Sequence, residues 1–141
     1  MEHKNQKANM ISLISRWKLR DGCAPELLDG IREATSVIEN SEPGTLMYSV
    51  HLPARNPVAA FNRPVTADQA IPLADQAEVV FFEIYRDADA FAAHLGGQAF
   101  QSFLARYLHC FYPDPANPKM PLTETVFLDR QAAFVRPASR S

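Results

Sequence analysis

The sequence contains little cysteine and little glycine, and each shortage argues against a familiar kind of site. Its two cysteines, Cys23 and Cys110, lie far apart and match neither a CxxC motif nor a cysteine–histidine spacing typical of zinc sites, so we expect free thiols. None of the five glycines has the spacing of a phosphate-binding loop. The sequence therefore predicts no metal centre and no phosphate-binding loop.

The sequence also lacks a charge excess and a long apolar run. Fourteen basic and sixteen acidic residues leave a net charge of −2, which creates no field that would attract nucleic acid or an anionic membrane. No apolar run reaches the roughly 18 to 20 residues of a membrane-spanning helix. The polar start, residues 1–9, does not resemble a secretory signal. We therefore expect a cytoplasmic protein with neither nucleic acid nor membrane as a partner.

Length and composition indicate a globular chain. An apolar fraction of 47% and a charged fraction of 21% are typical of folded domains, and 141 residues suit a single one. We expect a flexible tail at 1–9, one domain at 10–136 and a second tail at 137–141. Within the domain, residues 53–76 carry four prolines and no sustained periodicity. A loop of this length is expected to cover a site or to stay mobile.

Hydrophobic periodicity predicts two helical regions among four strands. Apolar residues recur at three- and four-residue steps behind Pro25 up to Ile38, and again behind a capping Asp87 up to Phe111, with a break at Gly96-Gly97. Prolines between 113 and 121 predict a rigid loop. Alternating or apolar runs predict strands at 11–18, 45–52, 79–85 and 123–135. This order predicts an α+β ferredoxin-like sandwich, a four-stranded antiparallel sheet with helices on one face.

The strand at 79–85 is apolar on both faces. Val79, Phe81 and Tyr85 alternate with Val80, Phe82 and Ile84. Since helices on one side of the sheet can cover only one of these sets, the other set is expected to pack against a second subunit. The sequence thus predicts a homodimer joined sheet to sheet.

Few residues suggest catalysis. The GxSxG and HExxH motifs are absent, and no cysteine or carboxylate stands at ligand spacing from any pair among the four histidines. The segment from Glu83 to His94 is the most informative. It combines a strand ending in Glu-x-Tyr, a capped turn, and a helix that presents a histidine one turn after Phe91.

With Pro-Gly-Thr-Leu-Met-Tyr at 43–48 before it and Phe100 and Phe103 after it, this segment resembles the antibiotic biosynthesis monooxygenase (ABM) family over residues 10–112. The resemblance implies a small dimeric ferredoxin-like protein. It also implies oxidation of a small aromatic quinol or a polyketide-like phenol by O2, without flavin, haem or metal. Some members resemble isomerases, so a non-oxidising isomerase or a binder of a small apolar metabolite is the alternative.

Two positions depart from the family pattern. Ala99 stands where many relatives carry a second histidine, and this favours the non-oxidising alternative. Leu104 stands ten residues after His94, where the haem-degrading branch has its iron ligand, so haem binding is not implied.

The proposed chemistry requires a group that accepts a proton inside a dry, aromatic-lined pocket, because a phenol reacts with O2 more readily as its anion. Imidazole titrates near neutral pH, at a pKa of about 6.5, and aromatic walls stack against a planar ring. We expect catalytic roles for His94, Glu83 and Tyr85, and substrate binding by Trp17, Tyr48, Phe91 and Phe103.

Purely structural roles would also explain these residues. His94 on an apolar helix face is equally consistent with a buried neutral histidine bonded to a backbone carbonyl. Glu83 is also consistent with a structural ion pair, with Arg16, Arg86 or Arg130 as its partner. A third interpretation is a structural dimer whose vestigial cavity is smaller than a single aromatic ring.

Overall fold

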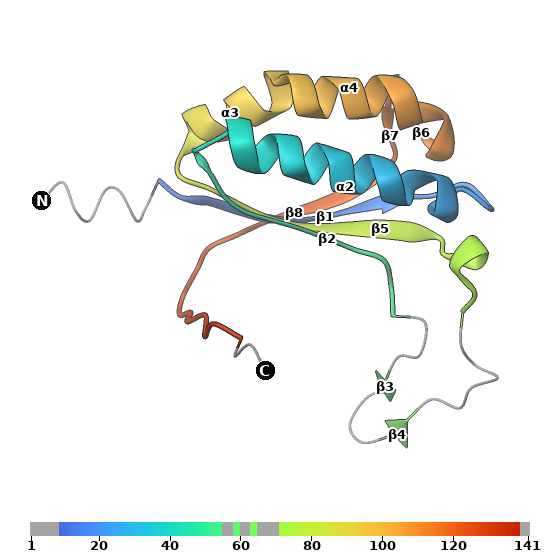
Figure 1. Ribbon diagram of the computed structural model, residues 1–141, viewed down its shortest axis with the longest axis horizontal. Coiled ribbons are helices and arrows are strands. Elements are labelled where there is room, and N and C mark those ends of the chain that lie inside the picture. The colour runs from blue at the N-terminus through green and yellow to red at the C-terminus, as the bar shows by residue number, and fades with distance from the viewer. Residues whose placement is uncertain (1–8, 55–57, 60–62, 65–70, 139–141) are drawn as a thin grey trace, which may run out of the picture.

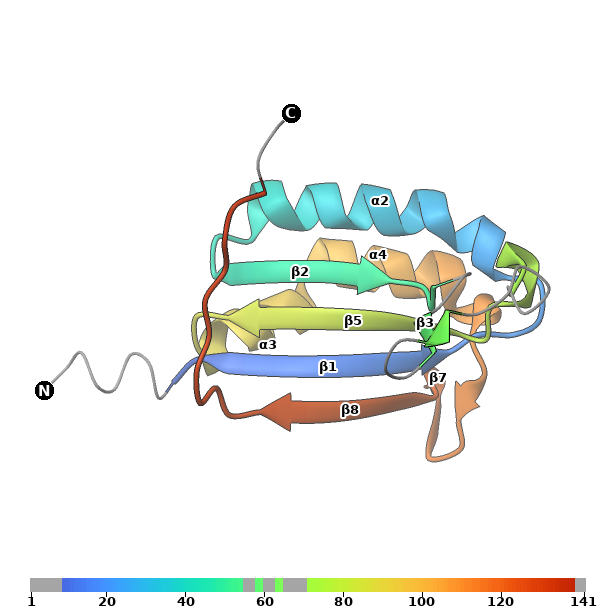
Figure 2. The same cartoon turned by 90° about the horizontal axis from the view of Figure 1, so that it is seen from below.

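The computed structural model describes residues 9–54, 58–59, 63–64 and 71–138. Its main sheet holds four antiparallel strands in the order β2-β5-β1-β8, and Figure 2 shows them from the side away from the helices. The strands are β1 (Ile11–Lys18), β2 (Thr45–His51), β5 (Glu78–Tyr85) and β8 (Thr123–Leu128).

Helices cover one face of this sheet. In the described residues they are α2 (Ala24–Ser41), α3 (Ala88–Gly96) and α4 (Gln98–Tyr107), and Figure 1 shows all three above the strands. The predicted α+β architecture is thereby confirmed. None of the described helices combines the length and the apolar character that crossing a membrane requires.

Strand register determines which side chains face the helices. Leu13 pairs with Glu83 and Phe127, and Ser15 pairs with Phe81 and Thr125. Because side chains alternate along a strand, the odd-numbered residues of β1 and β5 point toward the helices. The larger core cluster lies in this layer and includes Trp17, Leu19, Leu27, Val79, Phe81, Phe103, Tyr107 and Phe111.

Gly30 lets α2 pack closely against a side chain of α4. A Cβ atom built on Gly30 would overlap the ring of Tyr107 on α4. The sequence alone marks this glycine as a weak point in a helix, since glycine costs up to ~1 kcal/mol relative to alanine there. The structure shows that its missing side chain makes room for a buried aromatic ring.

The link from β5 to α3 places His94 over the sheet. Asp87 caps α3, and its side chain accepts a hydrogen bond of 2.8 Å from the Ala90 amide, which lowers the pKa of Asp87. The predicted interruption at Gly96-Gly97 is confirmed, because α3 ends at Gly96 and α4 begins at Gln98. His94 thus lies in the last turn of a short helix above β5.

Two predicted elements are longer than the structure shows. The helical region ends at Tyr107 rather than Phe111; the short helix η3 (Leu108–Cys110) follows, and Phe111 bridges to Leu19. The strand predicted at 123–135 ends at Leu128, which pairs with Ser12. Since β1 begins one residue earlier, at Ile11, a longer β8 would have almost no partner strand to pair with.

The prediction of a rigid loop at 113–121 is wrong. These residues form a hairpin of β6 (Pro113–Asp114) and β7 (Asn117–Pro121). Proline is compatible with such edge strands, where the missing N–H group removes no ladder hydrogen bond.

The segment at 53–76 contains short elements of its own. β3 (Val58–Ala59) pairs with β4 (Arg63–Pro64), and η2 (Leu73–Asp75) follows. Residues 55–57, 60–62 and 65–70 lie outside the described residues, as do 1–8 and 139–141 of the predicted tails. The predicted domain limits and the covering role of this segment therefore stay predictions.

Gly30→Ala should destabilise the fold although alanine is the better helix former. The added methyl group must displace Tyr107, and overpacking of this kind costs roughly 1–3 kcal/mol. Gly96→Ala is the matched control, because a Cβ there meets nothing within 4 Å, and it should gain up to ~1 kcal/mol. Urea unfolding measures both changes. A Gly30→Ala variant as stable as the parent chain would contradict the close approach.

Candidate functional site

A cleft of about 150 Å³ lies between the helix layer and the sheet. Five aromatic residues form part of its walls, and its polar lining includes His94 from α3, Glu83 from β5 and Ser15 from β1. An apolar site with a few convergent polar groups is the usual form of a small-molecule pocket. The aromatic lining residues are Trp17, Tyr48, Phe81, Phe91 and Phe100.

His94 is held by a carboxylate from another element. Its side chain is only 2% exposed, and its Nδ1 lies 2.8 Å from Oε1 of Glu42, the residue that follows α2. The same oxygen accepts a hydrogen bond of 3.1 Å from the Thr45 hydroxyl. A carboxylate acceptor places the imidazole proton on Nδ1, so the lone pair of the neutral ring is on Nε2.

Glu83 is the second carboxylate beside His94. Its Oε1 lies 3.6 Å from Nε2 of His94 and accepts a hydrogen bond of 2.5 Å from the Tyr85 hydroxyl. Burial raises the pKa of Glu83, and the nearby Glu42 charge adds to this effect; the Tyr85 hydrogen bond and the charge of His94 oppose it. This carboxyl group therefore keeps its proton to a higher pH than an exposed glutamate does.

Two tyrosines next to His94 remain protonated phenols. Burial raises the pKa of Tyr85 above its ordinary value, and so does the Glu83 charge. The pKa of Tyr48 is raised by burial first and then by the charges of Glu83 and Glu42. The ring centres of Tyr48 and Tyr85 lie 5.6 Å and 5.4 Å from that of His94. The imidazole is thus enclosed by aromatic rings and carboxylates.

The structure places six of the seven predicted site residues at the cleft or directly behind it. Trp17, Tyr48, Phe91, Glu83 and His94 line the cleft, and Tyr85, which is fully buried, supports Glu83 from behind. Their roles in binding and catalysis stay predictions.

Phe103 is the exception. It packs against Trp17, at 6.3 Å between ring centres, and lines a different hollow between α2 and α4 together with Gly30 and Ala99. Phe100, one turn earlier on α4, lines the cleft instead, because a step of three residues turns a side chain by about 60° around the helix axis.

The contacts bear on the structural roles weighed from the sequence. Nδ1 of His94 bonds a carboxylate and not a backbone carbonyl. Arg16 pairs with Glu78 at 2.9 Å and Arg86 with Asp87 at 3.3 Å, whereas Glu83 contacts Tyr85 and His94.

Sequence reasoning missed Glu42. The available signal was a carboxylate directly before the Pro43-Gly44 turn, but it lies 52 residues from His94, and no local spacing links the two. The inference drawn from Ala99 is also affected. Ala99 lines the hollow between α2 and α4 and not the His94 cleft.

Glu83→Gln should change how stability depends on pH. Because the pKa of Glu83 in the folded chain is raised above 4.5, the folded state binds more protons than the unfolded state above that pH. Stability therefore falls as pH rises through the raised pKa. Glutamine cannot ionise and still accepts from Tyr85, so the variant should gain stability relative to the parent as pH rises. Urea unfolding from acid to neutral pH measures this difference.

Glu33→Gln on the exposed face of α2, where the carboxylate is 65% exposed, controls for the loss of one negative charge. Equal pH dependence of the parent and Glu83→Gln chains would show that Glu83 titrates normally.

Comparison with known proteins supports this fold. A model of the antibiotic biosynthesis monooxygenase family matches residues 10–106. No curated protein matches the chain significantly.

Solved structures with the same fold include two proteins provisionally assigned as antibiotic biosynthesis monooxygenases. One, from Caulobacter crescentus, is 16% identical with a TM-score of 0.61, over 94% of this chain and 100% of the other. The second, from Bacteroides thetaiotaomicron, is 19% identical with a TM-score of 0.60, over 94% of this chain and 99% of the other.

A variant of SnoaB, a cofactor-independent oxygenase from Streptomyces nogalater, is 11% identical with a TM-score of 0.55, over 91% of this chain and 99% of the other. These identities show likeness of fold. The family model covers more than half of the chain, and the chain therefore belongs to the antibiotic biosynthesis monooxygenase family.

Proposed function

We propose that this chain is a cofactor-independent monooxygenase that oxidises a small aromatic quinol or phenol with O2. The observation that carries the proposal is His94, buried at an aromatic-lined cleft with Glu42 on one ring nitrogen and Glu83 near the other. Membership of the ABM family supports the reaction class. SnoaB, with the same fold, is described as a cofactor-independent oxygenase.

The size of the cleft favours a single-ring substrate. An apolar cavity of about 150 Å³ in a protein holds one benzene molecule, and the cleft has about this volume. It therefore exceeds the vestigial cavity considered from the sequence. A fused polyketide-like phenol would have to extend through the mouth of the cleft, so a monocyclic quinol is the better fit.

The residues of the cleft suit proton removal from a phenol. Nε2 of His94 accepts the hydroxyl proton, and the Glu42 carboxylate on Nδ1 stabilises the resulting imidazolium. The substrate anion then reacts with O2. Hydroquinone and O2 give hydroxyquinone and water, so one oxygen atom enters the ring, the other leaves as water, and no external reductant is needed.

A second function is favoured by the pairing of His94 with Glu83. Nε2 of His94 lies 3.6 Å from Oε1 of Glu83, and both side chains can take up and release a proton. Such a pair could remove a proton from one atom of a bound molecule and return it to another. An isomerase that does not consume O2 would use the same cleft, and so would a binder of a small apolar metabolite.

We also propose that the chain forms a homodimer through the open face of the sheet. Phe82, Val126 and Leu128 are 37%, 57% and 44% exposed there, and Phe134 and Val135 on the segment after β8 are 78% and 91% exposed. An apolar surface of this kind is typical of an interface. The apolar alternation on both faces of β5 supports a second copy as its occupant.

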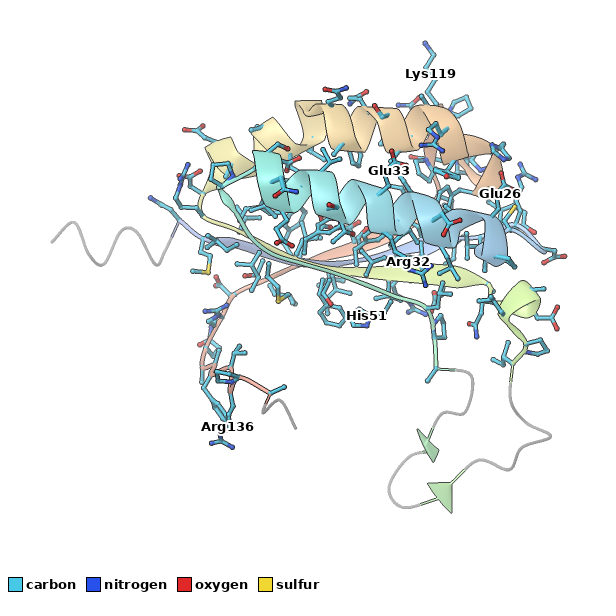
Figure 3. All side chains as sticks on the ribbon, viewed as in Figure 1. Glu26, Arg32, Glu33, His51, Lys119 and Arg136 are labelled. Carbon is cyan, nitrogen blue, oxygen red and sulfur yellow. The ribbon has the colours of Figure 1, made fainter. Side chains whose placement is uncertain are left out.

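Oxygen uptake with a monocyclic hydroquinone tests the oxygenase proposal. The colourless purified chain should consume O2, and His94→Ala should lower the rate on the order of 10²-fold, because the proton acceptor is lost. His51→Ala, on the opposite face of the sheet, should keep the parent rate; Figure 3 labels this residue. Unchanged turnover in His94→Ala would remove His94 from the mechanism.

The fluorescence of Trp17, the single tryptophan, separates the two functions. If a quinol panel quenches this fluorescence while no member is oxidised, the binding or isomerase function holds instead.

Phe82→Asp should dissociate the dimer. Light scattering coupled to size exclusion should give twice the 15.7 kDa chain mass for the parent and a single chain mass for the variant, because a buried unpaired carboxylate is costly. Val37→Asp, at a similarly exposed residue of α2 (41%), should remain dimeric. A monomeric parent would refute the proposal.

A further inference from the structure

Four side chains with metal-binding atoms lie close together, two at the start of α2 and two in η3, the short helix after α4. A sulfur of Cys23, a carboxylate oxygen of Glu26 and the sulfur of Cys110 all lie within 4.8 Å of one another. Nε2 of His109 lies 2.9 Å from Oε1 of Glu26 and 3.5 Å from the Cys110 sulfur. Figure 3 shows Glu26 on the first turn of α2.

We propose that this thiol cluster, Cys23, Glu26, His109 and Cys110, binds one Zn²⁺ ion or a similar thiophilic divalent cation. Zinc in proteins prefers four ligands in a tetrahedron, drawn from cysteine sulfur, histidine nitrogen and carboxylate oxygen. With ligand bonds of roughly 2.0–2.3 Å, the ligand atoms of such a site are about 3.3–3.8 Å apart. Separations of up to 4.8 Å among Cys23, Glu26 and Cys110 would have to contract by about 1 Å. The 3.5 Å between His109 and Cys110 already fits, and the 2.9 Å between His109 and Glu26 would lengthen slightly.

The fold holds both halves of the thiol cluster in place. The Arg20 amide donates a hydrogen bond of 2.8 Å to the Cys110 carbonyl, and Leu19 bridges to Phe111. Both contacts tie the segment before α2 to the segment after α4. A metal bound here would therefore add a cross-link between two chain segments that already touch.

The two thiols of the cluster are more buried than its carboxylate and imidazole, so a cation can enter from the exposed side. Cys110 is fully buried and Cys23 is half-buried, whereas the side chains of Glu26 and His109 are 54% and 61% exposed. The exposed carboxylate and imidazole offer the first contacts to an entering cation. The thiols then supply the ligands that bind zinc most strongly.

The Cys110 thiol keeps its proton in the metal-free chain, because burial and the neighbouring Cys23 and Glu26 raise the pKa of this thiol to about 12. Metal binding must therefore displace a proton from Cys110, and affinity should rise with pH.

This proposal is independent of the proposed oxygenase. None of the four residues lines the His94 cleft. Both cysteines are free, as the sequence predicts. The proposal differs from the expectation of no metal centre, which rested on spacing along the chain, because the cluster joins residues 83 positions apart.

Cobalt titration of the reduced, metal-free full chain tests the site. One equivalent of Co²⁺ should produce the near-ultraviolet charge-transfer band of thiolate coordination, and Zn²⁺ should abolish it by displacement. Zn²⁺ should also raise the midpoint of thermal unfolding, because it binds only the folded chain. Cys23→Ser, at a half-buried position, should remove most of the band.

Variants separate the site from general thiol reactivity. Glu26→Gln and His109→Ala alter exposed positions and should weaken binding by at least tenfold without unfolding the chain. Glu33→Gln, an exposed carboxylate farther along α2, should leave affinity unchanged. The proposal is wrong if Co²⁺ gives no sulfur band while both thiols titrate as free. It is equally wrong if Cys23→Ser and His109→Ala bind as the parent does.

Discussion

A buried imidazole is costly unless its nitrogens find partners, and His94 finds one for Nδ1 in Glu42 at 2.8 Å. This contact joins the end of α2 to the last turn of α3 and directs Nε2 toward Glu83 on the sheet. The cleft depends on it, because α3 covers the sheet at the point where His94 is held. The carboxylate fixes the tautomer of the ring and, together with the aromatic rings packed around it, its orientation.

The desolvation that encloses the cleft also determines its chemistry. Burial raises the pKa of Glu83, Tyr48 and Tyr85, so the two tyrosines remain neutral hydrogen-bond donors beside His94. Burying a carboxyl group beside Glu42 reduces the stability of the chain above the ordinary pKa of a glutamate. In the proposed function, this loss of stability maintains a site in which a proton moves away from bulk water.

Local pattern predicted the elements whose shape depends on their own residues. β1 was located from its alternation, β5 from its apolar run, and α3 from the Asp87 cap, which the Ala90 amide confirms. The errors lie where an element depends on a partner. β8 ends near the start of β1, because β1 extends no further to serve as its pairing partner. The proline-rich residues 113–121 form a hairpin because β6 and β7 pair with each other.

By itself the sequence determined the order of helices and strands, the placement of Glu83 and Tyr85 on the same face of their strand, and the likeness to the ABM family. These follow from periods of two and 3.6 residues and from one short motif, all of which are local. The tertiary structure alone decided that Glu42 is the partner of His94, that Phe100 rather than Phe103 faces the cleft, and that Cys23 and Cys110 meet. Each of these is a contact between side chains of different elements, and its existence depends on how those elements pack, which no spacing along the chain encodes.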